Sequence, residues 1–171
     1  MSSHKTPFRK PPYSNTTVPM EKTKAEIEIL LKAYGVKGIQ WTSIGNEEDL
    51  KFLMEVTVRG VRRELAFQVK PSQVQITKRV PGRGLVKTED RNQEYRLLYW
   101  WIKSKLEAVY WGLSTIEKEF LSQVIVSLPN GPTTMGDVAQ EAIAKGSVES
   151  LPFIQEKRAL EKVNPKIIDA Q

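Results

Sequence analysis

The fold is decided by residues 50–69, which read LKFLMEVTVRGVRRELAFQV. Apolar side chains alternate with other side chains along both halves, residues 50–58 and Val61–Val69. A period of two is typical of a β-strand with one buried face. Arg59 and Gly60, which separate the halves, are typical of a tight hairpin turn. The stretch therefore predicts two antiparallel strands that share a core face.

One more strand and a helix are predicted before this hairpin. Residues 39–44 indicate a first strand, and the polar run at 45–49 indicates a turn after it. A helix is predicted over 23–34, where Thr23 and Glu26 have the spacing of a capping box. The apolar residues of this helix recur on one face: Ile27, Leu30, Leu31 and Tyr34.

The region after the hairpin predicts a loop and then a long helix. Pro71 interrupts the strand pattern, and residues 74–76 are expected to form a short fourth strand at the sheet edge. Residues 78–87 are expected to form a loop. Asp90 places negative charge at the start of a helix that runs to Trp111, where Gly112 follows. The apolar stripe of this helix consists of Tyr95, Leu98, Ile102, Leu106 and Val109.

The C-terminal part predicts short elements. A capping box at 114–117 opens a short helix, a strand covers 123–128, a turn covers 129–132, and a small helix begins at residue 134 and ends at Gly146. The expected fold class is α+β: a helix, an antiparallel sheet of three or four strands, a long aromatic helix on one face of the sheet, and a small C-terminal helical part.

Composition sets the domain organisation and excludes several chemistries. The 171 residues suit one domain, expected over 21–150, with a flexible basic tail at 1–20 and an extension at 151–171. The absence of Cys excludes disulfides, Cys-ligated metal sites and a thiol nucleophile. A single His argues against a catalytic triad. We therefore expect no enzyme, no cofactor and no metal.

The positive charge is concentrated in one segment. Residues 59–91 hold nine basic and three acidic residues, which equals the net charge of +6 for the whole chain. Such a concentration is typical of a surface that contacts phosphates. The alternatives are a basic face that is merely solvated and a basic face that binds an acidic protein. The candidate phosphate contacts are Arg62, Lys70, Lys78, Arg79, Arg83 and Lys87.

Six aromatic residues occur in the long helix, more than one buried face needs. Trp100 and Trp111 are eleven residues apart and share nearly one angular position, as do Tyr99 and Tyr110. These four residues are expected to pack in the core or at a subunit interface, or to stack on bases.

Two resemblances follow from these patterns. The order helix, three antiparallel strands, helix over 23–111 is similar to the double-stranded-RNA-binding domain, and it also resembles the core of single-strand-annealing recombinases. Four short segments resemble a group of small phage and prophage proteins without an established activity: KTKAEI at 22–27, IKSKLEAV at 102–109, GLSTIEKEFL at 112–121 and LPNG at 128–131. This second resemblance implies a mobile-element context.

The sequence thus predicts a non-enzymatic nucleic-acid-binding protein, with single-strand binding or annealing as the activity to test and DNA favoured over RNA. The alternative is an assembly protein that forms a homo-oligomer through its aromatic helix. The longest apolar run, residues 97–102, is too short to cross a membrane. We therefore expect no membrane partner and a cytoplasmic location, in the host cell if the protein is encoded by a phage.

Overall fold

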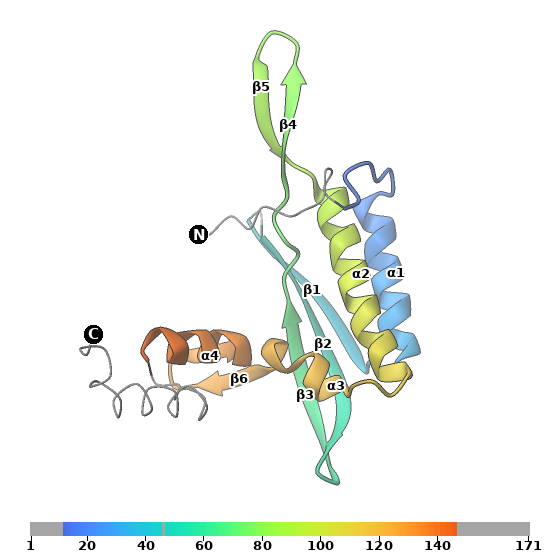
Figure 1. Ribbon diagram of the computed structural model, residues 1–171, viewed down its shortest axis with the longest axis vertical. Coiled ribbons are helices and arrows are strands. Elements are labelled where there is room, and N and C mark those ends of the chain that lie inside the picture. The colour runs from blue at the N-terminus through green and yellow to red at the C-terminus, as the bar shows by residue number, and fades with distance from the viewer. Residues whose placement is uncertain (1–11, 46, 147–171) are drawn as a thin grey trace, which may run out of the picture. The chain divides into compact units, whose positions relative to one another are not determined.

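The computed structural model describes residues 12–45 and 47–146, and it has an α+β fold (Figure 1). The chain divides into two compact units, Met1–Gly136 and Asp137–Gln171. The first unit holds the sheet, the two long helices and the basic segment. The expectations for residues 1–11 and 151–171 lie outside the described residues.

A three-stranded antiparallel sheet forms the centre of the first unit. Its strands are β1 (Gly38–Ile44), β2 (Glu47–Val58) and β3 (Val61–Val69), in the order β1-β2-β3. Phe52 lies opposite Phe67 in the register. Both predicted strands of the hairpin are confirmed, and so is the first strand.

The turn between β2 and β3 explains why the register is well defined. Arg59 and Gly60 both have positive φ, 50° and 79°. Positive φ at both central residues is the geometry of the two-residue turn whose twist matches antiparallel strands. The pairing of Val58 with Val61 next to this turn therefore fixes which side chains face the core.

Two helices cover one face of the sheet: α1 (Met20–Ala33) and α2 (Arg91–Tyr110) (Figure 1). Tyr95, Leu98, Ile102 and Leu106 of α2 are buried, as the predicted apolar stripe requires. The core cluster contains Ile27, Leu31, Leu50, Phe52, Met54, Val56, Phe67, Val69, Leu98, Ile102, Leu106, Phe120 and Val124.

The predicted capping box at the start of α1 is wrong. The helix begins three residues earlier, after Pro19, and Thr23 is buried within it. The backbone N–H of Met20 donates instead to Asn92 Oδ1 of α2 at 2.9 Å. A cap from a neighbouring helix satisfies the same orphan donor that a local Thr side chain would satisfy.

Residues 78–87 are not a loop, which corrects the sequence prediction. β4 (Gln75–Val80) and β5 (Gly84–Glu89) pair as a separate two-stranded antiparallel sheet, so the expected fourth strand does not join the main sheet. Pro81 and Gly82 form the turn, with Gly82 at φ 78° and the Arg83 N–H donating to the Val80 carbonyl at 3.1 Å. Pro followed by a positive-φ Gly is the chemistry of a type II turn.

The elements after α2 are short. They are α3 (Ile116–Glu119), η1 (Leu121–Gln123), β6 (Ile125–Leu128), β7 (Gly131–Thr134) and α4 (Met135–Ala144). The predicted strand and the small helix are confirmed, whereas β7 was expected as a turn. The predicted capping box at 114–117 does not form, because the N-cap of α3 is Thr115 rather than Ser114 and Thr115 makes no side-chain cap. A bridge between Phe67 and Val124 places η1 and β6 at the outer edge of β3.

Candidate nucleic-acid interface

The β4–β5 hairpin, residues 75–89, is called the arm below. Figure 1 shows it as a two-stranded ribbon joined to the end of β3 and the beginning of α2. Every residue of β5 is exposed. An isolated hairpin of this kind exposes both of its faces to solvent or to a partner.

The two faces of the arm differ in chemistry. Residues directly opposite each other in an antiparallel pair lie on one face. The pairs Gln75–Glu89, Thr77–Lys87 and Arg79–Leu85 therefore give a face that carries two cations and, at the base of the arm, one carboxylate. The other face carries the aliphatic side chains Ile76, Val80 and Val86.

Three cations of the arm lack acidic partners among the described residues. In the described part of the chain, no carboxylate lies within ion-pair distance of Arg79, Arg83 or Lys87. Arg83 occupies the turn, and Lys78 pairs with Val86 in the strand register. The arm therefore carries four basic residues against one acidic residue, Glu89.

The remaining two predicted contacts lie elsewhere and are paired. Arg62 Nη1 is 3.7 Å from Glu55 Oε1, near the opposite end of β3. Lys70 Nζ lies 3.6 Å from Glu47 Oε2 and 3.8 Å from Asp49 Oδ1. Eight residues of strand separate Arg62 from Lys70, about 26 Å. The predicted set is thus split into the arm, its base and a distant strand end.

The base of the arm is tied to α2 by hydrogen bonds. The Asp90 N–H donates to the Val74 carbonyl at 2.9 Å, and the Val74 N–H donates to Glu94 Oε1 at 2.8 Å. Asp90 also caps α2 by accepting from the Gln93 N–H at 3.2 Å. Burial raises the pKa of the Glu94 carboxyl, because removal from water disfavours its charged form.

A buried ionic cluster lies beside this base, and sequence analysis missed it. Glu48 is buried; its carboxylate contacts Lys24 Nζ at 2.5 Å and Arg91 Nη2 at 3.5 Å and accepts from Ser43 Oγ at 3.0 Å. Residues 45–49 were expected as a turn. The alternation of Leu50 and Phe52, extended back by two residues, would have placed Glu48 on the core face.

The four candidate aromatic residues fall into two pairs. The rings of Trp100 and Tyr13 are stacked, with their centroids 6.1 Å apart. The guanidinium carbon of Arg96 lies 4.7 Å from the centroid of the Tyr99 ring. Tyr110 and Trp111 are about 70% exposed at the end of α2. Tyr99 and Trp100 therefore have ring contacts with Arg96 and Tyr13, whereas the rings of Tyr110 and Trp111 contact each other, with centroids 5.2 Å apart, and remain open to a partner.

Residues 12–19, expected as part of the tail, contact α2. Gln93 Nε2 donates to the Pro12 carbonyl at 2.6 Å, and Tyr13 provides the stack on Trp100. Pro12 and Tyr13 therefore lie against the N-terminal half of α2.

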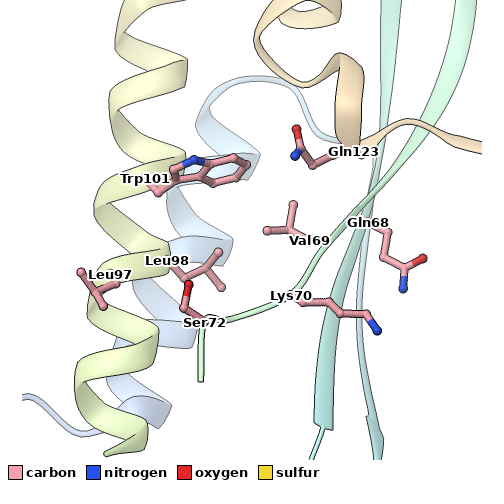
Figure 2. A pocket seen from close by; sticks show the side chains of 8 residues that line it. All are labelled: Gln68, Val69, Lys70, Ser72, Leu97, Leu98, Trp101 and Gln123. Carbon is pink, nitrogen blue, oxygen red and sulfur yellow. The ribbon is translucent and has the colours of Figure 1, made fainter. Parts of the chain in front are cut away.

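A cavity of about 370 Å³ lies between α2 and the end of β3 (Figure 2). Its apolar lining comes from Val69, Leu97, Leu98 and Trp101, and its polar lining comes from Gln68, Lys70, Ser72 and Gln123. Apolar walls with a few polar groups are typical of sites for small groups.

The described residues hold neither a metal-binding cluster nor a membrane-spanning helix. No group of three or more carboxylate or imidazole side chains is placed to hold a metal ion. No helix among them is long and apolar enough to cross a membrane. Comparisons with family models, with curated proteins and with solved structures give no match for this chain.

Proposed function

We propose that this chain is a non-enzymatic nucleic-acid-binding protein whose arm contacts backbone phosphates. The observation that carries the proposal is the arm itself, which exposes Arg79, Arg83 and Lys87 without acidic partners in residues 12–45 and 47–146. Elsewhere in the segment Arg62 and Lys70 have carboxylates nearby. Unpaired cations on an exposed ribbon attract a polyanion more strongly than paired ones do.

The shape of the arm favours DNA over RNA when the target is a duplex. The major groove of B-form DNA admits a two-stranded β-ribbon, whereas the major groove of A-form RNA is too narrow for side chains to read. A single strand is also accessible to the arm, since it exposes its phosphates on all sides. The preference for single or double strands is therefore determined by the binding experiment below.

Fluorescence anisotropy with labelled single-stranded and double-stranded DNA and RNA tests the proposal at two salt concentrations. We expect submicromolar binding at low salt and a steep loss of affinity at high salt, because bound phosphates release counterions. The ligand that binds most tightly shows whether the protein prefers DNA or RNA and single or double strands. Similar affinity for all four ligands indicates contact with the backbone alone. Absence of binding at low salt would reject the proposal.

A second candidate function is assembly through the end of α2. Tyr110, Trp111 and Leu113 are all more than two-thirds exposed in the first unit. Clustered exposed apolar residues are typical of protein interfaces. Sedimentation velocity without nucleic acid tests this candidate: a defined oligomer that dissociates in Trp111→Ser supports it, and a monomer at all concentrations excludes it.

A further inference from the structure

The end of the arm that lies farthest from α2 along the register is apolar. The pairing of β4 with β5 ends at Val80–Gly84, and the three residues between them form the turn. Residues 80–85 are called the tip below. Leu85 is 75% exposed, Val80 is 36% exposed, and Pro81 is exposed as well. The tip therefore presents three apolar side chains to solvent or to a partner.

Pro81 has the properties of a group that can enter an apolar layer. It occupies the first corner of the type II turn, which the Arg83 N–H closes by donating to the Val80 carbonyl. Proline has a fixed φ and no backbone N–H, so its insertion leaves no donor without a partner. A Cβ added at Gly82 would meet nothing within 4 Å, so the space beside the corner is open. The turn thus offers a rigid apolar ring.

Cations flank these apolar side chains. Arg79 lies opposite Leu85 in the register, and Arg83 belongs to the turn. Neither has a carboxylate within ion-pair distance in the part of the chain that the structure describes. Duplex DNA combines anionic phosphates on its outside with a stack of bases inside. An apolar tip between cations matches this combination, since the cations and the tip each meet their complement.

The dimensions of the arm suit a reach to the bases. Each strand of the arm has six residues, which span about 20 Å. The grooves of B-form DNA are about 7.5–8.5 Å deep. Lys87 lies opposite Thr77, three residues before Val80, which is about 10 Å along the strand. A tip that touches the base edges therefore leaves Lys87 at the level of the phosphates.

We propose that the tip inserts between two adjacent base pairs of duplex DNA and kinks the duplex there. Leu and Pro are among the side chains that act as such wedges, because they partly unstack a base step without a polar group to satisfy. Two hydrogen bonds from Val74 to the first turn of α2 anchor the other end of the arm. The proposal rests on the proposed function, because the cations of the arm supply the phosphate contacts.

Energy transfer between dyes at the two ends of a duplex of about 20 base pairs tests the kink. A kink brings the ends closer together, so the transfer efficiency rises. Anisotropy in the same samples shows when the duplex is saturated with protein. We expect the wild type to raise the transfer efficiency by the amount that a kink of about 20–90° produces.

Two tip variants separate insertion from phosphate contact. Leu85→Thr keeps a side chain that favours strands but adds a hydroxyl, which is unfavourable between stacked bases. It should lose most of the rise in transfer and keep the salt dependence of binding. Pro81→Ser, which changes the turn instead of a strand, should act in the same way. The matched control is Ile44→Thr, at a β1 residue that is also 75% exposed, and it should bend DNA like the wild type.

A mismatch provides the second test. Opening a base step costs least where a base pair is already mismatched. The wild type should therefore bind a duplex with one central mismatch about tenfold more tightly than the matched duplex. Leu85→Thr should bring this ratio close to one, whereas Ile44→Thr should leave it unchanged.

The outcomes separate the wedge from the arm contact. Saturated binding without a rise in transfer and without a preference for the mismatch would overturn the wedge and leave the phosphate contact standing. Bending that persists in both tip variants would also overturn it, since another surface would then bend the DNA. Binding to single strands alone rejects the wedge but not the proposed function. If no nucleic acid binds, both proposals fail.

Discussion

The Glu94 carboxylate of α2 accepts a hydrogen bond at 2.8 Å from the backbone N–H of Val74, immediately before the arm. Glu94 is buried, and its neighbour Asp90 bonds the carbonyl of the same Val74. Both backbone groups of Val74 are therefore held by the first turn of α2. This arrangement fixes where the arm leaves the rest of the unit.

The Glu94 carboxyl predicts a pH-dependent stability. Burial raises its pKa above the ordinary value of 4.5, so ionisation costs more in the folded chain than in the unfolded chain. As pH rises from 4.5 through the raised pKa, the free energy of unfolding of the wild type should fall relative to that of Glu94→Gln. Below pH 4, where the carboxyl is protonated in both the folded and the unfolded chain, this difference should disappear. The charged groups facing this carboxyl are Glu47, Glu48, Lys70, Glu89, Asp90 and Arg91. Urea unfolding at several pH values measures the difference.

Glu94→Ala is the matched comparison. Glutamine keeps a carbonyl acceptor for the Val74 N–H, whereas alanine leaves that donor without a partner. We expect Glu94→Ala to be about 1–3 kcal/mol less stable than Glu94→Gln at all pH values. If Glu94→Gln and Glu94→Ala behaved alike, the hydrogen bond to Val74 would have no role in stability.

The buried cluster around Glu48 predicts a large loss on truncation. Glu48→Ala removes the shared partner of Lys24 and Arg91 and leaves both cations in a partly buried site. The loss of one partner from a buried pair is expected to cost about 3 kcal/mol. Glu107→Ala, which removes an exposed helix pair with Lys103, should cost less than about 1 kcal/mol. Equal losses in the two variants would show that the cluster does not stabilise the fold.

The ring cluster predicts the most sensitive apolar position. Phe120 is fully buried, and its ring makes edge contacts with the rings of Phe52, Phe67 and Trp101. The ring centroids are 5.7 Å apart for Phe52 and for Trp101, and 5.8 Å apart for Phe67. Phe120→Ala should cost about 3–5 kcal/mol by leaving a cavity among these rings. Leu113→Ala, at a residue that is 82% exposed, should change stability by less than about 0.5 kcal/mol. Thermal unfolding of both variants checks the contrast.

The sequence predicted the parts of the fold that local patterns determine. The alternation around Arg59–Gly60 predicted β2 and β3, and the apolar stripe with its Asp90 start predicted α2. These elements depend on side-chain periodicity and local turns, which are visible in a sequence. The prediction of a loop over 78–87 missed the arm, although the order of Pro81 and Gly82 also favours a hairpin turn.

Long-range partners explain the other differences. Thr23 is not a cap because Asn92, about 70 residues away, supplies the acceptor. Glu48 is not in a turn because Lys24 and Arg91 approach it from two helices. No sequence spacing encodes such pairs. The candidate site was predicted as a charge concentration, but its division into unpaired and paired cations required the structure.

The difference between unpaired cations on the arm and paired cations elsewhere gives the most direct test of the interface. The triple variant Arg79→Gln, Arg83→Gln and Lys87→Gln removes three unpaired cations of the arm. If each contacts one phosphate of duplex DNA, the slope of log affinity against log salt should become less steep by about 0.9 per lost contact. The measurement is anisotropy over a series of salt concentrations.

A triple variant of equal charge change separates contact from net charge. Arg62, Lys32 and Lys145 are exposed cations with acidic partners, Glu55, Glu28 and Glu141. Their replacement by Gln lowers the net charge by the same three units. If phosphates lie on the arm, this variant should keep most of the salt slope and lose little affinity. Equal losses in both triple variants would mean that binding follows overall charge, and the arm would then have no special role.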